Sequence, residues 1–199
     1  MDEDRVSDRL ERWNASEGDK TVGGLIDVFE EKAFAVLFLV LLGVPALPLP
    51  TGGATHVFEV IAVLLAAQLV AGREEIWLPE KLRARELGGP RQQRFLAGLL
   101  RFLRRLERLS KPRMRFLFDR RIANVVFGLL IIGLSVAAFV APPFTGLDTL
   151  PALGAVIISV GVLLEDALLV IAGLIVGAAG VFLEIFVGAK AFDAIKSLF

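Results

Sequence analysis

Two long stretches of this chain are almost free of charge. Residues 33–58 contain no Asp, Glu, Lys or Arg, and in residues 122–164 the only such residue is Asp148. Runs of this length exceed what a compact soluble core can bury in a chain of 199 residues, 55% of which are hydrophobic. The sequence therefore predicts an all-α integral membrane protein.

Several kinds of catalytic and metal site are excluded by composition. The chain has no cysteine, which removes disulfides, thiolate metal sites and a cysteine nucleophile, and its single histidine, His56, rules out a polyhistidine metal site. It also lacks metal-ligand spacing, a nucleophile elbow and a phosphate loop. We therefore expect no catalytic site, no metal and no cofactor, and an enzyme is the less favoured reading.

Basic residues gather in the middle of the chain. Residues 73–121 carry 15 Lys and Arg against 6 Asp and Glu, whereas residues 1–32 carry 5 basic and 10 acidic side chains. By the positive-inside bias this linker faces the cytoplasm, in a multi-pass protein of the bacterial inner (plasma) membrane. The polar start has no apolar h-region before residue 33, so no signal peptide is expected, and the first membrane segment would direct insertion.

The linker contains an amphipathic basic helix, which we expect to lie along anionic membrane lipids rather than to bind nucleic acid. Its apolar positions recur at helical spacing: Phe95, Leu96, Leu99, Phe102, Leu103, Leu106 and Leu109.

The first apolar unit has the pattern of a broken hairpin. Residues 33–47 and 57–71 are each about 15 residues long, short of the roughly 20 that span a bilayer. The turn between them has four helix-breaking residues, Pro48, Pro50, Gly52 and Gly53. This arrangement is typical of a re-entrant hairpin, with an ordinary extramembrane turn as the alternative.

A second unit of the same kind follows at residues 122–166, with its turn at residues 142–151. Shifting the sequence by 93 residues superposes Pro50 on Pro143, Gly53 on Gly146 and Arg73 on Asp166, while Pro151 ends the second turn. The chain therefore reads as an internal repeat of helix, turn and helix, an arrangement found in many transporters.

The terminal apolar run at residues 167–183 is expected to be a transmembrane helix. It carries Gly173, Gly177 and Gly180, a small-residue face that permits either a homodimer or a packing seam inside the chain. The whole chain then forms one membrane domain with five parts: a lead-in (1–32), the first hairpin (33–72), the basic linker (73–121), the second hairpin (122–166) and the terminal helix (167–199).

Ionisable and polar side chains in or beside apolar runs are the candidate functional residues. They are His56, Glu59, Gln68, Arg73, Asp148, Glu165 and Asp166, with Glu184 further along. His56 and Glu59 could form an acid–base pair, and Gln68 could bond to another helix or to turn backbone. Arg73 and Asp166 could pair across a pseudo-twofold axis, or simply lie at helix ends near headgroups.

An ordered set of short motifs resembles the ExoD family, and it extends over roughly residues 21–170. The motifs are residues 48–53, Gln68, Gly72-Arg73, Trp77-Leu78-Pro79, Glu107-Arg108, Pro112-Arg113, Pro151-Ala152 and Asp166. The chain departs from the family pattern at Glu165-Asp166-Ala167, where the family tends to have Arg-Asp-Gly.

The resemblance implies an inner-membrane protein associated with exopolysaccharide production. It also suggests kinship in design with DedA-type membrane proteins, which have re-entrant hairpins and are linked to lipid flipping and proton-coupled transport; this second step is fold-level analogy.

Three functions remain open at this point. The leading one is a small transporter or lipid-carrier translocation factor, acting on a polysaccharide or lipid-linked substrate with paired broken helices. The alternatives are a dimeric scaffold for exopolysaccharide machinery and an enzyme acting on a lipid-linked intermediate.

Overall fold

The structure is a computed structural model that describes residues 5–16, 20–29, 32–47, 55–73, 75–87, 89–110, 118, 121–141 and 145–196. The described residues form helices and no β-strand, apart from an isolated bridge between Thr21 and Glu86. The helices are α1 (Val6–Ala15), α2 (Val22–Phe29), α3 (Ala33–Gly43), α4 (His56–Val70), α5 (Glu80–Arg83), α6 (Pro90–Leu109), α7 (Arg121–Val140), α8 (Thr149–Leu163) and α9 (Ala167–Lys196). The prediction of an all-α fold is confirmed for this part of the chain.

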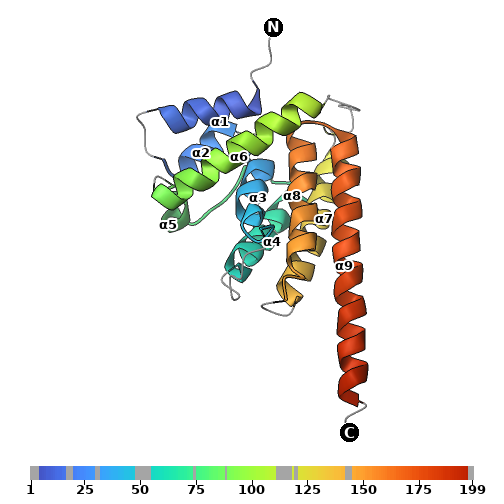
Figure 1. Cartoon of the computed structure of the whole chain (residues 1–199). Helices are drawn as coiled ribbons and strands as arrows, with labels where there is room; N and C mark the ends of the chain where they lie inside the picture. Colours follow the sequence, from blue (N-terminus) through green and yellow to red (C-terminus); the bar gives the residue numbers. More distant parts are fainter. Residues whose placement is uncertain are drawn as a thin grey trace.

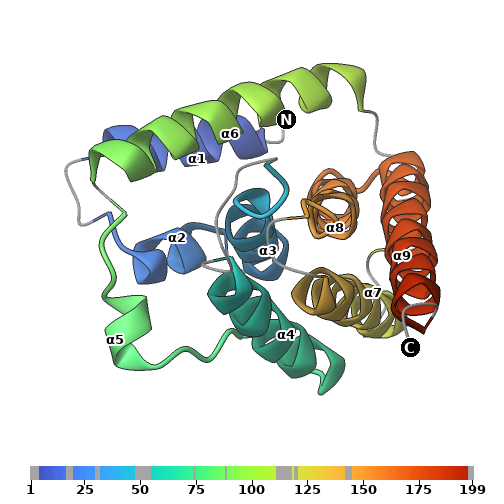
Figure 2. The same cartoon turned by 60° about the horizontal axis from the view of Figure 1, so that its bottom comes forward.

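Helix α3 lies at the centre of the molecule (Figure 2). Every residue from Ala33 to Leu39 is buried, because the helix is apolar on all sides and packs against α2, α4 and α8. The other main contacts join α4 to α7, α7 to α8, and α8 to α9. The two predicted hairpins thus pack against each other as one bundle.

Helices α1 and α6 form a layer across one end of this bundle (Figure 1). The apolar positions Leu96, Leu100 and Leu103 of α6 are buried, and Glu107 accepts a 2.9 Å hydrogen bond from the Ser7 backbone N–H. The prediction of an amphipathic helix is confirmed, but part of its apolar stripe packs inside the protein. The exposed side of the layer carries arginines: Arg94, Arg101, Arg104, Arg105 and Arg108.

Helix α9 extends beyond the apolar run at residues 167–183 and lies within the predicted terminal helix at residues 167–199, and it runs well past the far ends of the other helices (Figure 1). Within the described part of the chain, two segments are long and apolar enough to cross a membrane, Arg121–Val140 and Ala167–Lys190, while α3, α4 and α8 are shorter. Large apolar side chains stand exposed along the two long helices, among them Ile122, Val126, Leu129, Leu168, Ile171, Ile175, Phe182 and Ile185.

The glycine face of α9 packs against α8 inside the chain. A Cβ atom on Gly154 would lie 2.5 Å from the Cα of Gly177, and one on Gly173 would lie 2.7 Å from the backbone nitrogen of Ile158. One on Gly180 would meet Pro151 at 2.6 Å. Of the two uses that the sequence left open, the structure therefore has the internal seam.

Candidate functional site

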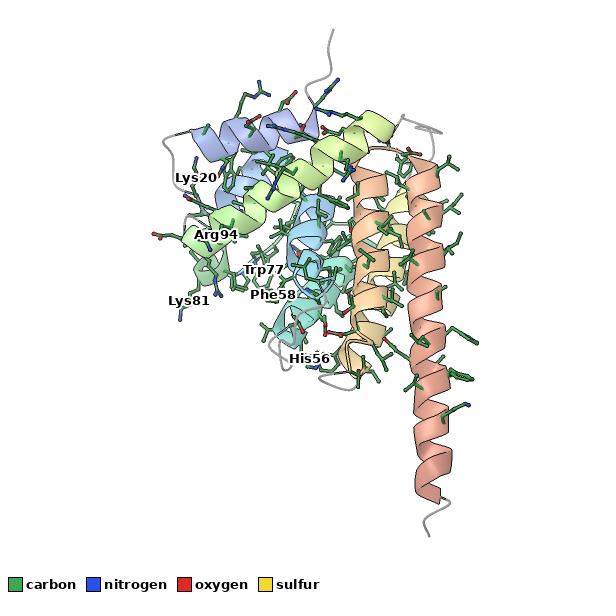
Figure 3. The ribbon with its side chains drawn as sticks, viewed as in Figure 1. Lys20, His56, Phe58, Trp77, Lys81 and Arg94 are labelled. Atoms are coloured by element: carbon green, nitrogen blue, oxygen red, sulfur yellow. The ribbon has the colours of Figure 1, made fainter. Side chains whose placement is uncertain are left out.

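A buried polar cluster lies at the end of the bundle away from α1 and α6, where His56 begins α4 (Figure 3). His56 Nδ1 lies 2.8 Å from Glu59 Oε2, because residues three apart share one face of a helix. The Glu59 side chain is fully buried, and its other carboxylate oxygen, Oε1, has no hydrogen-bond partner among the described groups. The expected pairing of His56 with Glu59 is therefore present.

Three further helices contribute to this cluster. Asp148, immediately before α8, and Glu184, on α9, interact electrostatically with each other and with Glu59. On α7, the Phe139 ring packs on His56 with the ring centres 5.0 Å apart. The cluster thus joins the tips of both hairpins to the long helix α9.

Two more buried polar atoms in this region lack a partner within the described chain. Ser135 Oγ is buried and unbonded, one turn from Phe139 on the same side of α7, and Glu184 Oε1 is also unbonded. Buried polar groups are normally satisfied, so these unpaired atoms single out this region as the candidate site. Among the described residues, no group of three or more His, Cys, Asp or Glu side chains is arranged to hold a metal ion.

Gln68 connects α4 to the segment that follows it. Its Nε2 donates to the Trp77 carbonyl at 3.0 Å, and its Oε1 accepts from the Trp77 N–H at 2.9 Å. Both hydrogen bonds go to backbone, so Gln68 holds this segment against α4. The Trp77 side chain itself stands exposed.

The helices α4 and α8 end in the same way, near the opposite end of the bundle. The N–H of Arg73 bonds to the Gln68 carbonyl, and the N–H of Asp166 bonds to the Gly161 carbonyl. These are the 6→1 bonds of a Schellman motif, and each motif also has its inner bond, to Leu69 and to Val162.

Arg73 and Asp166 have separate surroundings rather than a mutual ion pair in the described structure. Asp166 is 1% exposed, accepts a 2.9 Å hydrogen bond from Ser110 Oγ and caps α9 through the Leu168 N–H at 3.1 Å. Glu165 forms an ion pair with Lys32, with 2.9 Å between Oε1 and Nζ. Arg73 lines a cavity near that pair.

The predicted turn residues are only partly described. Pro48, Pro50, Gly52, Gly53 and Pro143 fall outside the described residues. Gly146 has a φ of 69°, a left-handed conformation that suits glycine.

Pro151, which the sequence placed at the end of the turn, lies inside the first turn of α8. There its missing N–H leaves no helical bond unmade.

Sequence reasoning did not single out Lys32, Ser110 or Ser135. Lys32 stands immediately before the first uncharged run, which is a signal that could have found it. Ser110 and Ser135 carry no comparable signal, because one serine in a basic linker or an apolar helix is common. Only the packing shows that Ser110 lies beside Asp166 and that the Ser135 hydroxyl is buried.

The family model described as "Exopolysaccharide synthesis, ExoD" matches residues 6–186. The chain belongs to the ExoD family. It is 30% identical to an uncharacterised protein of Synechocystis sp. over 151 residues, which are 76% of this chain and 70% of that protein. It is 27% identical to Protein ExoD of Rhizobium meliloti over 140 residues, which are 69% of this chain and 58% of that protein. No solved structure matches this ExoD-family chain.

Proposed function

We propose that this ExoD-family chain is an integral membrane protein that serves exopolysaccharide synthesis as a small translocation factor for a lipid-linked or other polar substrate. The observation that carries the proposal is the buried cluster around Glu59, in which three polar atoms have no partner among the described groups. Polar groups are costly at membrane depth, and in that setting they mark substrate and ion pathways.

The position of the exposed arginines and the direction of the hairpins support one orientation in the membrane. The exposed arginines of α6 lie at one end of the bundle, which the positive-inside bias assigns to the cytoplasm. Both hairpins begin and end near this layer, so each enters and returns on the cytoplasmic side (Figure 1).

The lengths of α4 and α8 support re-entrant hairpins, whereas α7, with 20 residues, is long enough to cross a membrane. At 15 residues each, α4 and α8 reach about 22 Å, less than the roughly 30 Å of a hydrocarbon core. With 30 residues, α9 reaches about 45 Å and is long enough to cross alone. In the re-entrant arrangement that we propose, the hairpin tips and the cluster between them lie inside the membrane.

Two matched hairpins support the internal repeat. Helices α4 and α8 have the same length, begin 93 residues apart and end in the same capping motif. In the repeat, α3 corresponds to α7 and α4 corresponds to α8. The contact between α4 and α7 therefore has an equivalent in the contact between α8 and α3, and both contacts are present. Both hairpins run the same way, which fits parallel repeats related by an axis along the membrane normal.

Proton exchange is the chemistry that the cluster offers. An imidazole and a carboxyl joined at 2.8 Å can share and release a proton, and Asp148 and Glu184 are acidic neighbours on separate helices. No described group occupies Glu59 Oε1, so a substrate hydroxyl, a cation or water could bond there. A substrate that meets this oxygen would couple its own passage to the protonation of the pair.

A scaffold for exopolysaccharide machinery is the second candidate, and the exposed arginine row of α6 favours it. The glycine seam does not add support, because α8 occupies that face of α9 within the chain.

Complementation separates the two candidates. The chain and its variants are expressed in a bacterial strain that lacks its own ExoD-family protein, and exopolysaccharide output is measured. The Glu59→Gln variant keeps the shape and a hydrogen-bonding side chain but cannot carry the charge. We expect it to lower exopolysaccharide output at least tenfold at an unchanged amount of membrane-inserted protein. Glu80→Gln, at an exposed position on α5, is the matched control and should keep full output. Full output from Glu59→Gln would contradict the translocation proposal and leave the scaffold.

A further inference from the structure

The cavity that Arg73 lines has a volume of about 440 Å³ and lies at the end of the two hairpins opposite the Glu59 cluster. Its lining includes Lys32, Arg73, Asn124 and Glu165, together with apolar side chains of α3, α4, α7 and α8. Arg73 and Asn124 are exposed residues, so the cavity is accessible from outside. Neither the translocation proposal nor the ExoD family match gives this cavity a role.

The charges around the cavity are unequal. Lys32 is neutralised by Glu165 at 2.9 Å, whereas the Arg73 guanidinium has no ion-pair partner among the described side chains. A second guanidinium, that of Arg121, lies beside the neighbouring backbone, since a Cβ atom on Gly72 would meet it at 2.6 Å. The rim of the cavity therefore carries an excess of positive charge.

Glu165 has an unfavourable backbone conformation. Glu165 has a φ of 54°, the only positive φ of a non-glycine residue in the described chain, while Gly72 occupies the same capping position at the end of α4 with a φ of 81°. A glycine would fit without strain at both positions, so the carboxylate at Glu165 costs conformational energy. Its side chain forms the ion pair with Lys32 at the edge of the cavity.

We propose that this cavity binds a phosphate group, with Arg73 as the principal contact and Lys32 as the second. A guanidinium offers paired N–H donors that match two phosphate oxygens, and an ammonium adds a point charge. The arginine row on α6 adds to a positive field at the same end of the molecule, which raises the local concentration of anions. The phosphate is either part of a lipid headgroup at the membrane surface or a soluble phosphate.

The test uses the full chain in lipid nanodiscs and has two arms. In the first arm, nanodiscs of phosphatidylcholine with a minor fraction of phosphatidic acid are analysed by native mass spectrometry for retained phosphatidic acid. In the second arm, inorganic phosphate is titrated by calorimetry against the protein in pure phosphatidylcholine. If phosphatidic acid is retained and inorganic phosphate does not bind, the ligand is the phosphate of a lipid headgroup. If inorganic phosphate binds, the ligand is a soluble phosphate.

Substitutions connect either result to this cavity. Arg73→Gln should weaken binding at least fivefold, and Arg73→Lys should recover part of it. Glu165→Gln should tighten binding severalfold, because it removes the negative charge and frees Lys32. Arg104→Gln, on the exposed side of α6, is the matched control and should change binding less than twofold.

Equal binding by Arg73→Gln and the unaltered chain would overturn the proposal, as would an equal loss in Arg104→Gln or no binding in both arms. These outcomes do not depend on exopolysaccharide output. The phosphate site and the translocation proposal therefore stand or fail separately.

Discussion

Gly72 and Glu165 hold the same position in two helix ends that are 93 residues apart, and both have a left-handed backbone, with φ of 81° and 54°. One hairpin uses the residue that this conformation favours, and the other uses a charged residue that it disfavours. Substitutions at these two positions therefore measure the free-energy cost of a side chain at a left-handed capping residue within one protein.

Replacing Glu165 by glycine should relieve the strained φ. Glu165→Gly and Glu165→Gln both lose the ion pair with Lys32, but only the glycine variant removes the side-chain penalty. We expect Glu165→Gly to be more stable than Glu165→Gln by about 1 kcal/mol. Reversible unfolding in mixed detergent measures this difference, and equal stability of the two variants would show that the conformation carries no strain.

Gly72→Ala should have the opposite effect. The added methyl group meets the Arg121 guanidinium at 2.6 Å, and the positive φ is retained. We expect a loss of about 1–2 kcal/mol in the free energy of unfolding. Gly133→Ala is the matched control, because nothing lies within 4 Å of its added methyl group on α7, and it should be neutral or stabilising. An equal free energy of unfolding for the two variants would show that neither the positive φ nor the contact with Arg121 disfavours a side chain at Gly72.

Gly154→Ala should open the seam between α8 and α9. Its methyl group would lie 2.5 Å from backbone atoms of Gly177, which cannot move without shifting a helix. Overpacking of this kind costs about 1–3 kcal/mol. Thermal unfolding with Gly188→Ala as control tests it, since that glycine has open space around it. Unchanged stability of Gly154→Ala would mean that the two helices pack less closely.

Gln68→Ala should release the Trp77 segment from α4. It removes both hydrogen bonds to the Trp77 backbone, which together contribute about 1–3 kcal/mol. We expect faster hydrogen exchange at the Trp77 amide and a changed Trp77 fluorescence, measured with Trp13 replaced by Phe. Gln68→Glu, which keeps the acceptor, should protect the Trp77 amide more than Gln68→Ala does. Slow exchange of the Trp77 amide in both variants would show that contacts other than those of Gln68 hold this segment.

Single cysteines report membrane position directly, because the chain has none of its own. A cysteine at Arg101 should react with an impermeant maleimide only from the cytoplasmic side, and one at Gly188 only from the opposite side. Cysteines at Thr145 and Gly146 should label slowly from both sides if the second hairpin ends inside the membrane. Rapid labelling of these tip positions from the side opposite Arg101 would make the hairpin a full crossing.

The helices of the bundle could be predicted from the sequence because their apolar runs are long and contain few charges. The predicted segment at residues 57–71 corresponds closely to α4, and α8 lies within the predicted second hairpin at residues 122–166. Helix α9 lies within the predicted terminal helix at residues 167–199, and its apolar part extends past the predicted run at residues 167–183 to Lys190. The hydropathy pattern reports what lipid tolerates, not where a helix ends.

The site was predictable only where its residues are neighbours in sequence. His56 and Glu59 are one helical turn apart, so their contact follows from helix geometry. The approach of Glu184 to Asp148 depends on how α9 packs against α8, and Ser110 reaches Asp166 across 56 residues of chain. Contacts of this kind come from tertiary packing, which periodicity does not encode.

The seam between α8 and α9 also sets an order of events during biosynthesis. Helix α8 packs against α3, α7 and α9, yet α9 follows α8 in the chain and leaves the ribosome after it. Until α9 is made, the α8 glycines Gly154 and Gly161 lack the α9 backbone that packs against them. The packing of α8 is therefore complete only after α9 has been synthesised and has closed on it.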